Sequence, residues 1–288
     1  MRIHILANKY AGAGKAPEMM ENIKPLLEGH DVTTSYTEKT PEKFIEYIES
    51  NGDINYLVAI GGDGTMNYAV QALAGKNTIL IPVDAGTGSD LSRTIGRVNV
   101  SHLNEIISSQ NYREIDLAQI QVNGTSKYFA NIMESGLGGN VMLKVNSVRR
   151  RTSLTFMSAI LGSLMSAQPV KATIEIENES ITADILDLII ANGQYYGKGI
   201  HASPDSDMGD GFLDVHLIKF MPKYKVMMRL NSLRNGSYIS YDEVINRKVK
   251  SIHVRCQSMV EIDGETMKAD EYTVSVCHNA LKIFPLNH

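Results

Sequence analysis

Tyr56-Leu57-Val58-Ala59-Ile60 runs directly into Gly61-Gly62-Asp63-Gly64-Thr65, and these ten residues decide the fold. The first half is apolar throughout, which is typical of a strand buried on both faces of a parallel sheet. The stretch after it, 66–73, has helical periodicity. A strand, a glycine-rich turn and a helix start together favour an anion site, because free N–H groups and the positive end of the helix dipole point out of the helix start.

Asp63 is the unexpected residue of this turn. A carboxylate repels phosphate, so its position indicates a cation or a donor between the two groups, as in a magnesium-bound nucleotide. A plain strand-to-helix turn with Asp63 as the helix N-cap explains the same five residues. The rest of the chain has to decide between these two interpretations.

The composition is that of an ordinary globular protein of 288 residues with a formal net charge of −4. Without a basic excess, a role in binding nucleic acid has no support. The chain begins directly on a strand-like segment, no apolar run reaches the roughly 20 residues of a membrane helix, and only two cysteines occur. We therefore expect a cytoplasmic protein with free thiols.

Two halves of the chain have different periodicities. In the first half, expected strands at 3–7, 32–36, 56–60 and 78–82 alternate with expected helices at 17–28, 41–50, 65–74 and 101–109. This alternation predicts a mainly parallel sheet covered by helices, with ligands bound beyond the carboxyl ends of the strands. We assign residues 1–116 to this nucleotide-binding α/β domain.

The period changes to two from about Asp116 onward, which predicts a mostly antiparallel, β-sandwich-like second domain at 117–288. Expected strands lie at 173–178, 181–191, 212–219, 250–256, 258–263, 272–277 and 280–284, with a hairpin turn at Asn123-Gly124 and helices at 154–165 and 223–233. We expect the active site in the cleft between the two domains.

Two further small-residue loops follow expected strands of the first half. Residues 8–15 follow the first strand, and residues 82–90, which include Gly86, Thr87 and Asp90, follow the fourth. Each loop alone is no better than an ordinary turn, and the first lacks the spacing of a P-loop. Three such loops at neighbouring strand ends predict one continuous anion-binding rim.

The second half has two acidic stretches. Asp207 and Asp210, with the carbonyl of Phe212, have plausible spacing for one hard cation, although a solvated turn explains them equally. Asp263 and Glu265 lie at a strand end, where one carboxylate can accept the proton of a hydroxyl that attacks a phosphate. An ordinary acidic turn is the alternative here.

Basic residues flank apolar runs at Arg149-Arg150-Arg151 before 154–165 and again within 219–228. Such runs either contact an anionic membrane surface or form core helices with solvated flanks.

The order of these motifs resembles that of the diacylglycerol kinase catalytic-domain family, which includes bacterial lipid kinases and is similar to sphingosine and ceramide kinases. The resemblance rests on 8–12, 61–67, 86–90, Asp116, Asn192-Gly193, 210–214 and 263–265, nearly the full length of the chain. It implies a kinase that uses ATP and Mg²⁺. Lys9, Ala11, Tyr68, Ser89 and Gly209 depart from the family pattern.

The resemblance also implies roles for individual residues. The positions similar to ATP-contacting ones are Asn8, Lys9, Tyr10, Ala11, Gly12, Thr37, Gly61, Gly62, Asp63, Gly64, Thr65, Met66, Asn67 and Thr87. Asp63, Asp90, Asp116 and Asp263 match an acidic network around the catalytic magnesium. Asp207, Asp210 and the Phe212 carbonyl match a structural magnesium site, and the proton acceptor matches Asp263, Glu265 or Asp63.

The expected function is therefore transfer of the ATP γ-phosphate to a lipid hydroxyl, that of diacylglycerol or a related lipid. A kinase of a soluble metabolite, similar to NAD kinases, and a nucleotide-binding regulatory protein without turnover are the alternatives. We expect the lipid to be met at the membrane surface, with peripheral contact at the inner face of the membrane, and no nucleic acid partner. A homodimer is compatible with the sequence.

Overall fold

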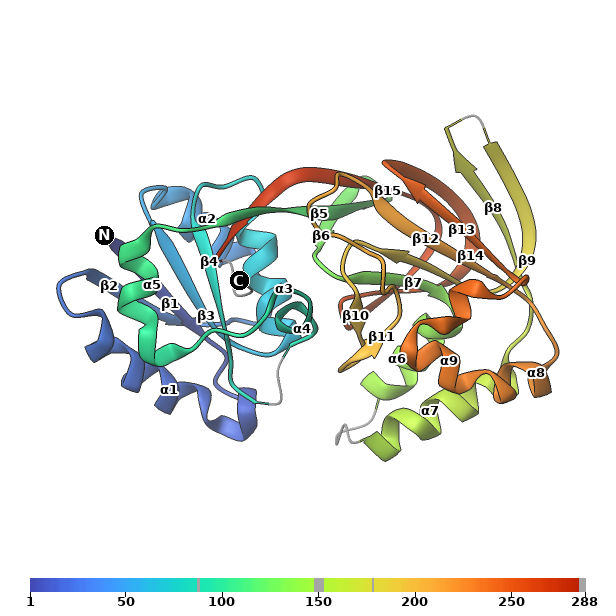
Figure 1. The fold of residues 1–288 in the computed structure, drawn as a ribbon, viewed down its shortest axis with the longest axis horizontal. Helices are drawn as coiled ribbons and strands as arrows, with labels where there is room; N and C mark the ends of the chain where they lie inside the picture. Colours follow the sequence, from blue (N-terminus) through green and yellow to red (C-terminus); the bar gives the residue numbers. More distant parts are fainter. Residues whose placement is uncertain (87–88, 148–152, 178, 285–288) are drawn as a thin grey trace. The chain divides into compact units, whose positions relative to one another are not determined.

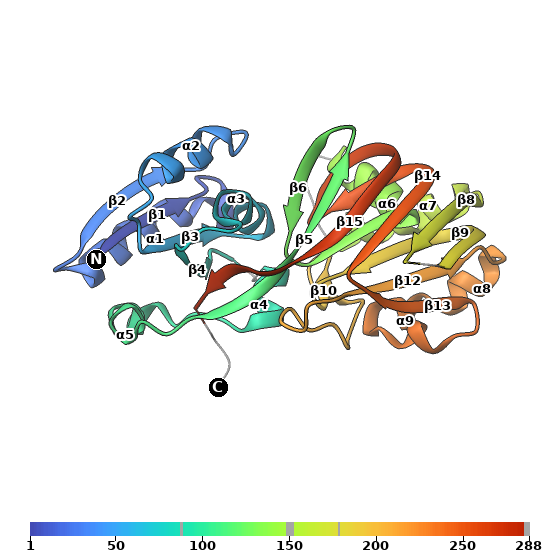
Figure 2. The same cartoon turned by 90° about the horizontal axis from the view of Figure 1, so that it is seen from above.

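The computed structural model describes residues 1–86, 89–147, 153–177 and 179–284, which form two compact units. The first unit is Met1–Leu117 together with residues 277–284, and the second is Ala118–Val276. Figure 1 and Figure 2 show the elements of both units from two directions. Thr87 and Arg149-Arg150-Arg151, which the sequence singles out, lie outside the described residues.

A parallel sheet forms the first unit, in the order β4-β3-β1-β2. Its strands are β1 (Arg2–Ala7), β2 (Asp31–Tyr36), β3 (Tyr56–Gly61) and β4 (Ile79–Asp84). The end of β15 (Glu265–Ile283) adds a parallel pairing to β4 at Ile283 and Leu80. Every residue of β3 is buried, as expected for a strand covered on both faces.

Helices cover both faces of this sheet. On one face, Ile5 and Val58 pack with α1 (Ala16–Ile23), the 3₁₀ turn η2 (Lys24–Leu27) and α5 (Leu103–Ser109). On the other face, α2 (Glu42–Ser50) and α3 (Asp63–Leu73) meet through Phe44 and Tyr68, whose ring centroids are 5.6 Å apart. Figure 2 shows α2 and α3 on the same side of the strands. The remaining elements are η1 (Ala11–Gly14), α4 (Asp90–Ile95) and η3 (Val100–His102).

The second unit is built from mostly antiparallel strands, in the order β13-β12-β9-β7-β14-β15. β8 also lies between β9 and β14, so β7 and β8 pair with different parts of the same two strands. The bounds are β5 (Arg113–Val122), β6 (Thr125–Phe129), β7 (Ile132–Gly136), β8 (Val170–Ile176), β9 (Glu179–Ala191), β10 (Tyr195–Tyr196), β11 (Ile200–His201), β12 (Leu213–Lys219), β13 (Val244–Val249) and β14 (Ser251–Ile262).

Four helices cover one face of these strands: α6 (Leu137–Asn146), α7 (Ser153–Ser166), α8 (Lys223–Met228) and α9 (Leu230–Asn235), followed by η4 (Ser237–Ser240). Val141 of α6, Leu164 of α7 and Val226 of α8 share one apolar cluster with the strands. The opposite face contributes to a second cluster, which includes Met133, Val260 and Tyr272. Figure 1 draws the four helices together beside the strands of this unit.

The expected α/β half followed by a mostly antiparallel β-rich half is confirmed. Element boundaries differ in several places. The strands expected at 250–256 and 258–263 form one strand, β14, with a register shift between Arg255 and Ser258. The two strands expected at 272–277 and 280–284 likewise belong to β15, and the pattern did not predict β7, β10, β11, β13, α4 or α6. Period-two alternation is lost at a bulge, so one bulged strand looks like two.

Candidate functional site

The glycine-bearing loops expected to form an anion-binding rim do meet at one edge of the first unit. Because β1, β3 and β4 are parallel, their carboxyl ends share this edge. Asn8 N donates to the Ile60 carbonyl at 3.2 Å, and Ala85 N donates to the Gly61 carbonyl at 3.0 Å. Thr37, after β2, joins the same edge because its N–H donates to the Ala7 carbonyl at 2.9 Å.

Two glycines of the rim are required by packing. Gly12 has φ of 60°, and a Cβ built on it would lie 1.7 Å from the Ala85 carbonyl oxygen. The loops after β1 and β4 therefore approach each other closely at Gly12. At Gly61, a Cβ would lie 2.0 Å from Thr65 Oγ1, because the first turn of α3 folds back over the end of β3. Neither position accepts a side chain without a shift of the backbone.

The other two glycines of the motif have no such packing reason. A Cβ on Gly62 or Gly64 would meet no neighbouring atom within 4 Å. Both residues lie at the start of α3, where the positive end of the helix dipole favours an anion. Thr65 Oγ1 is also buried there without a hydrogen-bond partner. Open space beside a helix start and an unpaired hydroxyl is what an incoming anion needs.

Carboxylates gather next to this open space. Asp63 Oδ1 accepts from the N–H of Asp90 at 2.5 Å, which joins the start of α3 to the start of α4. Asp90 itself is buried, and Arg93 lies 3.6 Å from its carboxylate. Asp84, at the end of β4, accepts from Ser89 N at 2.9 Å and from Ser92 Oγ at 3.0 Å. The structure therefore brings the Asp63 carboxylate against the backbone of Asp90, and their expected place in a magnesium-linked acidic network stays a prediction.

The remaining nucleotide candidates of the first unit differ in exposure. Tyr10 is exposed, and its N–H donates to Asn8 Oδ1 at 3.0 Å. Lys9 lies over the ring of Tyr36, 4.7 Å from the ring centroid. Met66 and Asn67 are buried within α3, whereas Ala11 of η1 is half-buried. Each of these residues except the two within α3 lies at the carboxyl edge of the sheet.

Asp116 has contacts with a different part of the first unit. Its side chain is fully buried, and Oδ1 accepts from His278 Nδ1 at 2.7 Å and from Asn279 N at 2.8 Å. Both partners belong to β15, which returns to the first unit from the far end of the chain. This carboxylate therefore fixes the returning strand, and its expected place in a magnesium-linked acidic network stays a prediction.

In the second unit, Asp263 occupies a tight turn between β14 and β15, with φ of 44°. Its carboxylate accepts from three successive backbone amides: Ala130 N at 3.0 Å, Asn131 N at 3.3 Å and Ile132 N at 3.2 Å. Glu265 is exposed at the same turn and pairs with Lys127 at 2.9 Å. Asp263 is thus held rigidly by the protein, whereas Glu265 is free to change partners.

This difference predicts unequal effects on stability. Asp263→Asn places an amide NH₂ opposite a backbone N–H, so we expect it to lower the free energy of unfolding by about 1–3 kcal/mol. Glu265→Gln removes an exposed ion pair and should change the same quantity by less than about 1 kcal/mol. Urea unfolding of the two variants beside the wild type measures both. Equal stability of the two variants would contradict the anchoring role of Asp263.

The predicted metal residues lie on the loop before β12. Asp207 Oδ1 accepts from Gly209 N at 3.0 Å, and Asp210 Oδ1 accepts from Phe212 N at 3.0 Å. The other oxygen of Asp210 pairs with Lys248 of β13 at 2.5 Å, which raises the pKa of the lysine. In the described part of the chain, no three His, Cys, Asp or Glu side chains are placed to hold a metal ion. A divalent ion at this loop would replace Lys248 beside Asp210, and the expected site of two carboxylates and the Phe212 carbonyl stays a prediction.

A buried acidic cluster is the feature of the second unit that sequence reasoning missed. Glu134 of β7 lies directly opposite Glu261 of β14, and Asp187 of β9 lies opposite Gly136, on the same face of the strands. All three carboxylates are buried. Each has one oxygen with a donor: Asp187 Oδ2 accepts from Gly138 N at 3.0 Å, Glu261 Oε1 from Gly264 N, and Glu134 accepts from Tyr196.

The second oxygen of each carboxylate has no hydrogen-bond partner, and neither does the buried hydroxyl of Tyr238. Burial raises the pKa of Glu134 to about 7. Burial, with the negative charge of Glu134 beside them, also raises the pKa values of Asp187 and Glu261. Exact pairing of Glu134 with Glu261 depends on strand register, so the sequence contained no signal that these acids share one buried place.

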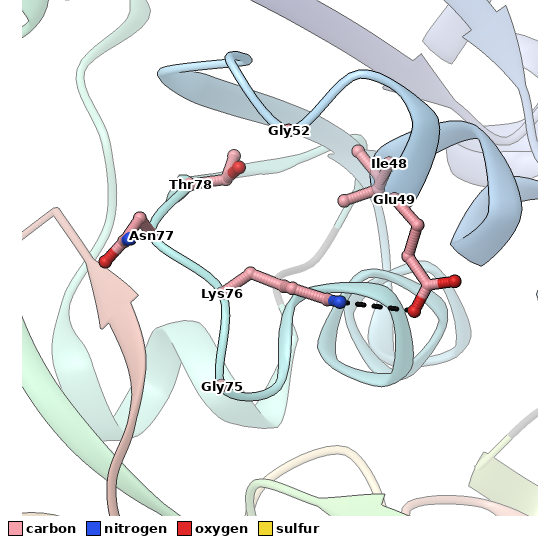
Figure 3. Close-up of a pocket in the computed structure, with 7 residues that line it drawn as sticks. All are labelled: Ile48, Glu49, Gly52, Gly75, Lys76, Asn77 and Thr78. Carbon is pink, nitrogen blue, oxygen red and sulfur yellow. Dashed lines mark hydrogen bonds and ion pairs between the residues drawn. The ribbon is translucent and has the colours of Figure 1, made fainter.

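A surface hollow of about 200 Å³ lies elsewhere in the first unit, lined by residues shown in Figure 3. Its lining residues are Ile48, Glu49, Gly52, Gly75, Lys76, Asn77 and Thr78. Those at 75–78 precede β4, and those at 48–52 precede β3, so the hollow is at the amino ends of the strands. Lys76 and Glu49 pair across it at 3.2 Å. It is therefore separate from the rim at the carboxyl ends.

No helix within the described residues is long and apolar enough to cross a membrane.

Comparison with known protein families matches residues 2–120 to the diacylglycerol kinase catalytic domain. Residues 131–285 match the YegS C-terminal NAD kinase beta sandwich-like domain. The two matches together span nearly the whole chain.

Individual relatives agree with these matches. A diacylglycerol kinase of Mycobacterium tuberculosis is 28% identical over 238 residues, which are 81% of this chain and 77% of the relative. The crystal structure of a diacylglycerol kinase from Bacillus anthracis has a TM-score of 0.70 at 18% identity, with 99% of this chain and 96% of the other covered.

The fold extends to a second class of kinase. An NAD kinase from Archaeoglobus fulgidus in complex with ATP has a TM-score of 0.56 at 14% identity, with 100% of this chain and 94% of the other covered. At such low identity this similarity concerns the fold alone. The two domain matches decide the family: the chain belongs to the diacylglycerol kinase catalytic-domain family of lipid kinases, with a YegS-type second domain.

Proposed function

We propose that this protein transfers the γ-phosphate of ATP to a lipid hydroxyl, that of diacylglycerol or a closely related lipid, with Mg²⁺ as the metal. The observation that carries the proposal is the open start of α3. Gly62 and Gly64 leave space there that packing does not require, beside the carboxylate of Asp63. The family of the chain supports a lipid as the acceptor.

The first unit would bind the nucleotide at its carboxyl edge. N–H groups at the start of α3 face the phosphates, while the loop at 8–12 closes the rim from the side of β1. Phosphoryl transfer requires mostly positioning and charge neutralisation, which rigid loops on a parallel sheet supply. The unpaired hydroxyl of Thr65 offers one more polar group to a bound nucleotide.

The residues at the rim fit a magnesium ion that is shared with ATP. Mg²⁺ is commonly held by one or two carboxylates together with substrate phosphates, and the carboxylate of Asp63 lies at the start of α4 because it accepts from the backbone N–H of Asp90. When bound, the ion would neutralise charge on the transferred phosphoryl group. Asp63 carries the negative charge on the protein side, and its bond to Asp90 N keeps that charge in place.

Asp63, Asp263 and Glu265 are the candidates for the group that accepts the hydroxyl proton. Three backbone amide donors hold the carboxylate of Asp263 in place. Glu265 has a single exposed ion-pair partner, Lys127. The pH dependence of kcat in the three single variants decides among them.

The proposal is tested with γ-labelled ATP, Mg²⁺ and a mixed lipid extract, followed by identification of the labelled product. We expect label in a phosphorylated diacylglycerol or related lipid, and none when Mg²⁺ is replaced by a chelator. Label in NAD but in no lipid would favour the soluble-metabolite alternative. A separate assay with NAD as the acceptor is included because an NAD kinase shares this fold. Tight ATP binding without product from any acceptor would favour a regulatory protein.

The two kinds of glycine in the rim give a matched pair of variants. Gly62→Ala should fold normally, since a Cβ there meets no atom within 4 Å, but should weaken ATP binding about tenfold or more by blocking phosphate approach. Gly61→Ala should instead lower the free energy of unfolding by about 1–3 kcal/mol through its clash with Thr65. Titration calorimetry with ATP and thermal unfolding separate the two effects. Unchanged ATP affinity in Gly62→Ala would contradict the phosphate site.

A further inference from the structure

We propose that the ends of α7 and α8 form a docking face for an anionic lipid bilayer. This docking face consists of Met165, Tyr224, Met227, Met228, Lys144 and Lys223. The inference rests on the proposed function for its biological sense, because a lipid kinase must reach an acceptor within a membrane. Its physical basis is a set of exposed apolar side chains beside positively charged lysines, and their effect on membrane binding can be tested without any kinase reaction.

Exposed apolar side chains concentrate on this face. Met228 is 81% exposed, Tyr224 is 68% exposed and Met165 is 65% exposed. Tyr224, Met227 and Met228 have i, i+3 and i+4 spacing, so they share one side of α8, while Val226 on the other side is buried in the apolar cluster. Large apolar groups gathered on one surface are typical of interaction sites.

α7 continues the same surface. Leu161 and Met165 are four residues apart and both exposed, whereas Leu164 between them is buried. Lys223 Nζ donates to the Met165 carbonyl, which joins the end of α7 to the beginning of α8. α7 and α8 also pack on one apolar cluster, and Figure 1 shows them on the same side of the strands.

The two stretches of chain that carry this surface are basic although the whole chain is acidic. Residues 135–174 and 215–241 contain none of the 32 Asp and Glu residues, but five Lys and Arg each, out of 28 in the chain. Three of these ten, Arg149 to Arg151, lie outside the described residues and are not part of the docking face. Lys225 and Arg229 share one carboxylate, Glu243, so that pair adds a single excess charge.

Two lysines of the face have neutral partners. Lys144 Nζ donates to Ser166 Oγ at 3.4 Å, and Lys223 Nζ donates to a backbone carbonyl. Both ammonium groups therefore keep their full positive charge at the end of α7, next to Met165. An apolar surface rimmed by unneutralised cations matches the interface of a bilayer, where acyl chains lie below anionic headgroups.

The test is co-sedimentation of the full chain with phosphatidylcholine vesicles, with and without phosphatidylglycerol, in the absence of ATP. We expect binding to the anionic vesicles that weakens with added salt. Met227→Ser with Met228→Ser should reduce this binding about tenfold or more. Lys223→Gln should reduce it about fivefold, the effect of one cation near an anionic surface.

Leu26→Ser with Lys24→Gln is the matched control, because it removes an exposed apolar and a basic side chain from the first unit. This control should bind as the wild type does, and all variants should keep the wild-type unfolding midpoint. Wild-type binding by the Met227 and Met228 variant would overturn the proposal, as would absence of wild-type binding to anionic vesicles. A change from dimer to monomer in that variant without lipid would assign the face to a second copy instead.

A kinase assay separates this inference from the proposed function. With a short-chain, water-dispersed diacylglycerol, the docking variants should have wild-type kcat, whereas with anionic vesicles their apparent KM should rise. If no lipid is phosphorylated in either form, the proposed function fails while the vesicle-binding result stands. If the docking variants lose activity equally on both substrates, the docking role fails instead.

Discussion

Replacement of Asp63 by asparagine is expected to lower lipid phosphorylation about 10²–10³-fold, the usual effect of removing one preorganised electrostatic group from a transition state. The exchange is conservative in structure. Asparagine keeps an oxygen that can accept from Asp90 N, so the link between α3 and α4 should persist while the negative charge is lost. Steady-state kinetics with labelled ATP should show the loss in kcat.

Two further variants serve as comparisons for this prediction. Asp31→Asn, which changes an exposed carboxylate at the edge of the same sheet, should leave kcat unchanged. Asp63→Ala removes the hydrogen bond as well as the charge, and should lower the unfolding midpoint more than Asp63→Asn does. Activity of Asp63→Asn within about fivefold of the wild type would remove Asp63 from the reaction.

The second large effect concerns stability and pH. Burial raises the pKa of Glu134 from its ordinary value of 4.5 to about 7. The folded protein therefore binds a proton at Glu134 more tightly than the unfolded chain does. The resulting stability is fully present below about pH 4.5 and is lost as the pH rises through about 7, so the free energy of unfolding should fall across this window.

Glu134→Gln tests this directly, because it removes the titrating group and keeps its shape. We expect the variant to be more stable than the wild type at pH 8, by about 3 kcal/mol or less, and nearly equal to it at pH 4.5. Asp187 and Glu261, whose pKa values are also raised, still titrate in the variant, so some decline with pH persists. Urea unfolding at both pH values measures the difference.

Asp242→Asn is the matched control, an exposed carboxylate of the same unit whose loss should leave the pH profile unchanged. Hydrogen exchange of the β7, β9 and β14 amides reports on the second unit alone, which matters because two units can unfold separately. A Glu134→Gln variant that is less stable than the wild type at pH 8 would show that the carboxylate is needed in its charged form.

The meeting of the glycine-bearing loops at one edge was predictable from sequence because its signals are local. Gly61 to Thr65 follow an apolar strand directly, and parallel strands place their carboxyl ends at one edge, so neighbouring loops must meet there. The docking face was partly predictable, since its basic and apolar runs are visible in the chain. That these runs form one surface could be seen only in the structure, where Lys223 donates a hydrogen bond to the Met165 carbonyl.

The sequence by itself determined the alternation of strands and helices, the change of period near Asp116 and the family, because each depends on neighbouring residues or on motif order. Tertiary structure alone decided which distant residues share a place. Strand register set Glu134 against Glu261, and the return of β15 brought His278 to Asp116 across 162 positions. The local sequence pattern indicates whether a residue faces the core or the solvent. The pairing between distant strands depends on the packing of the whole sheet.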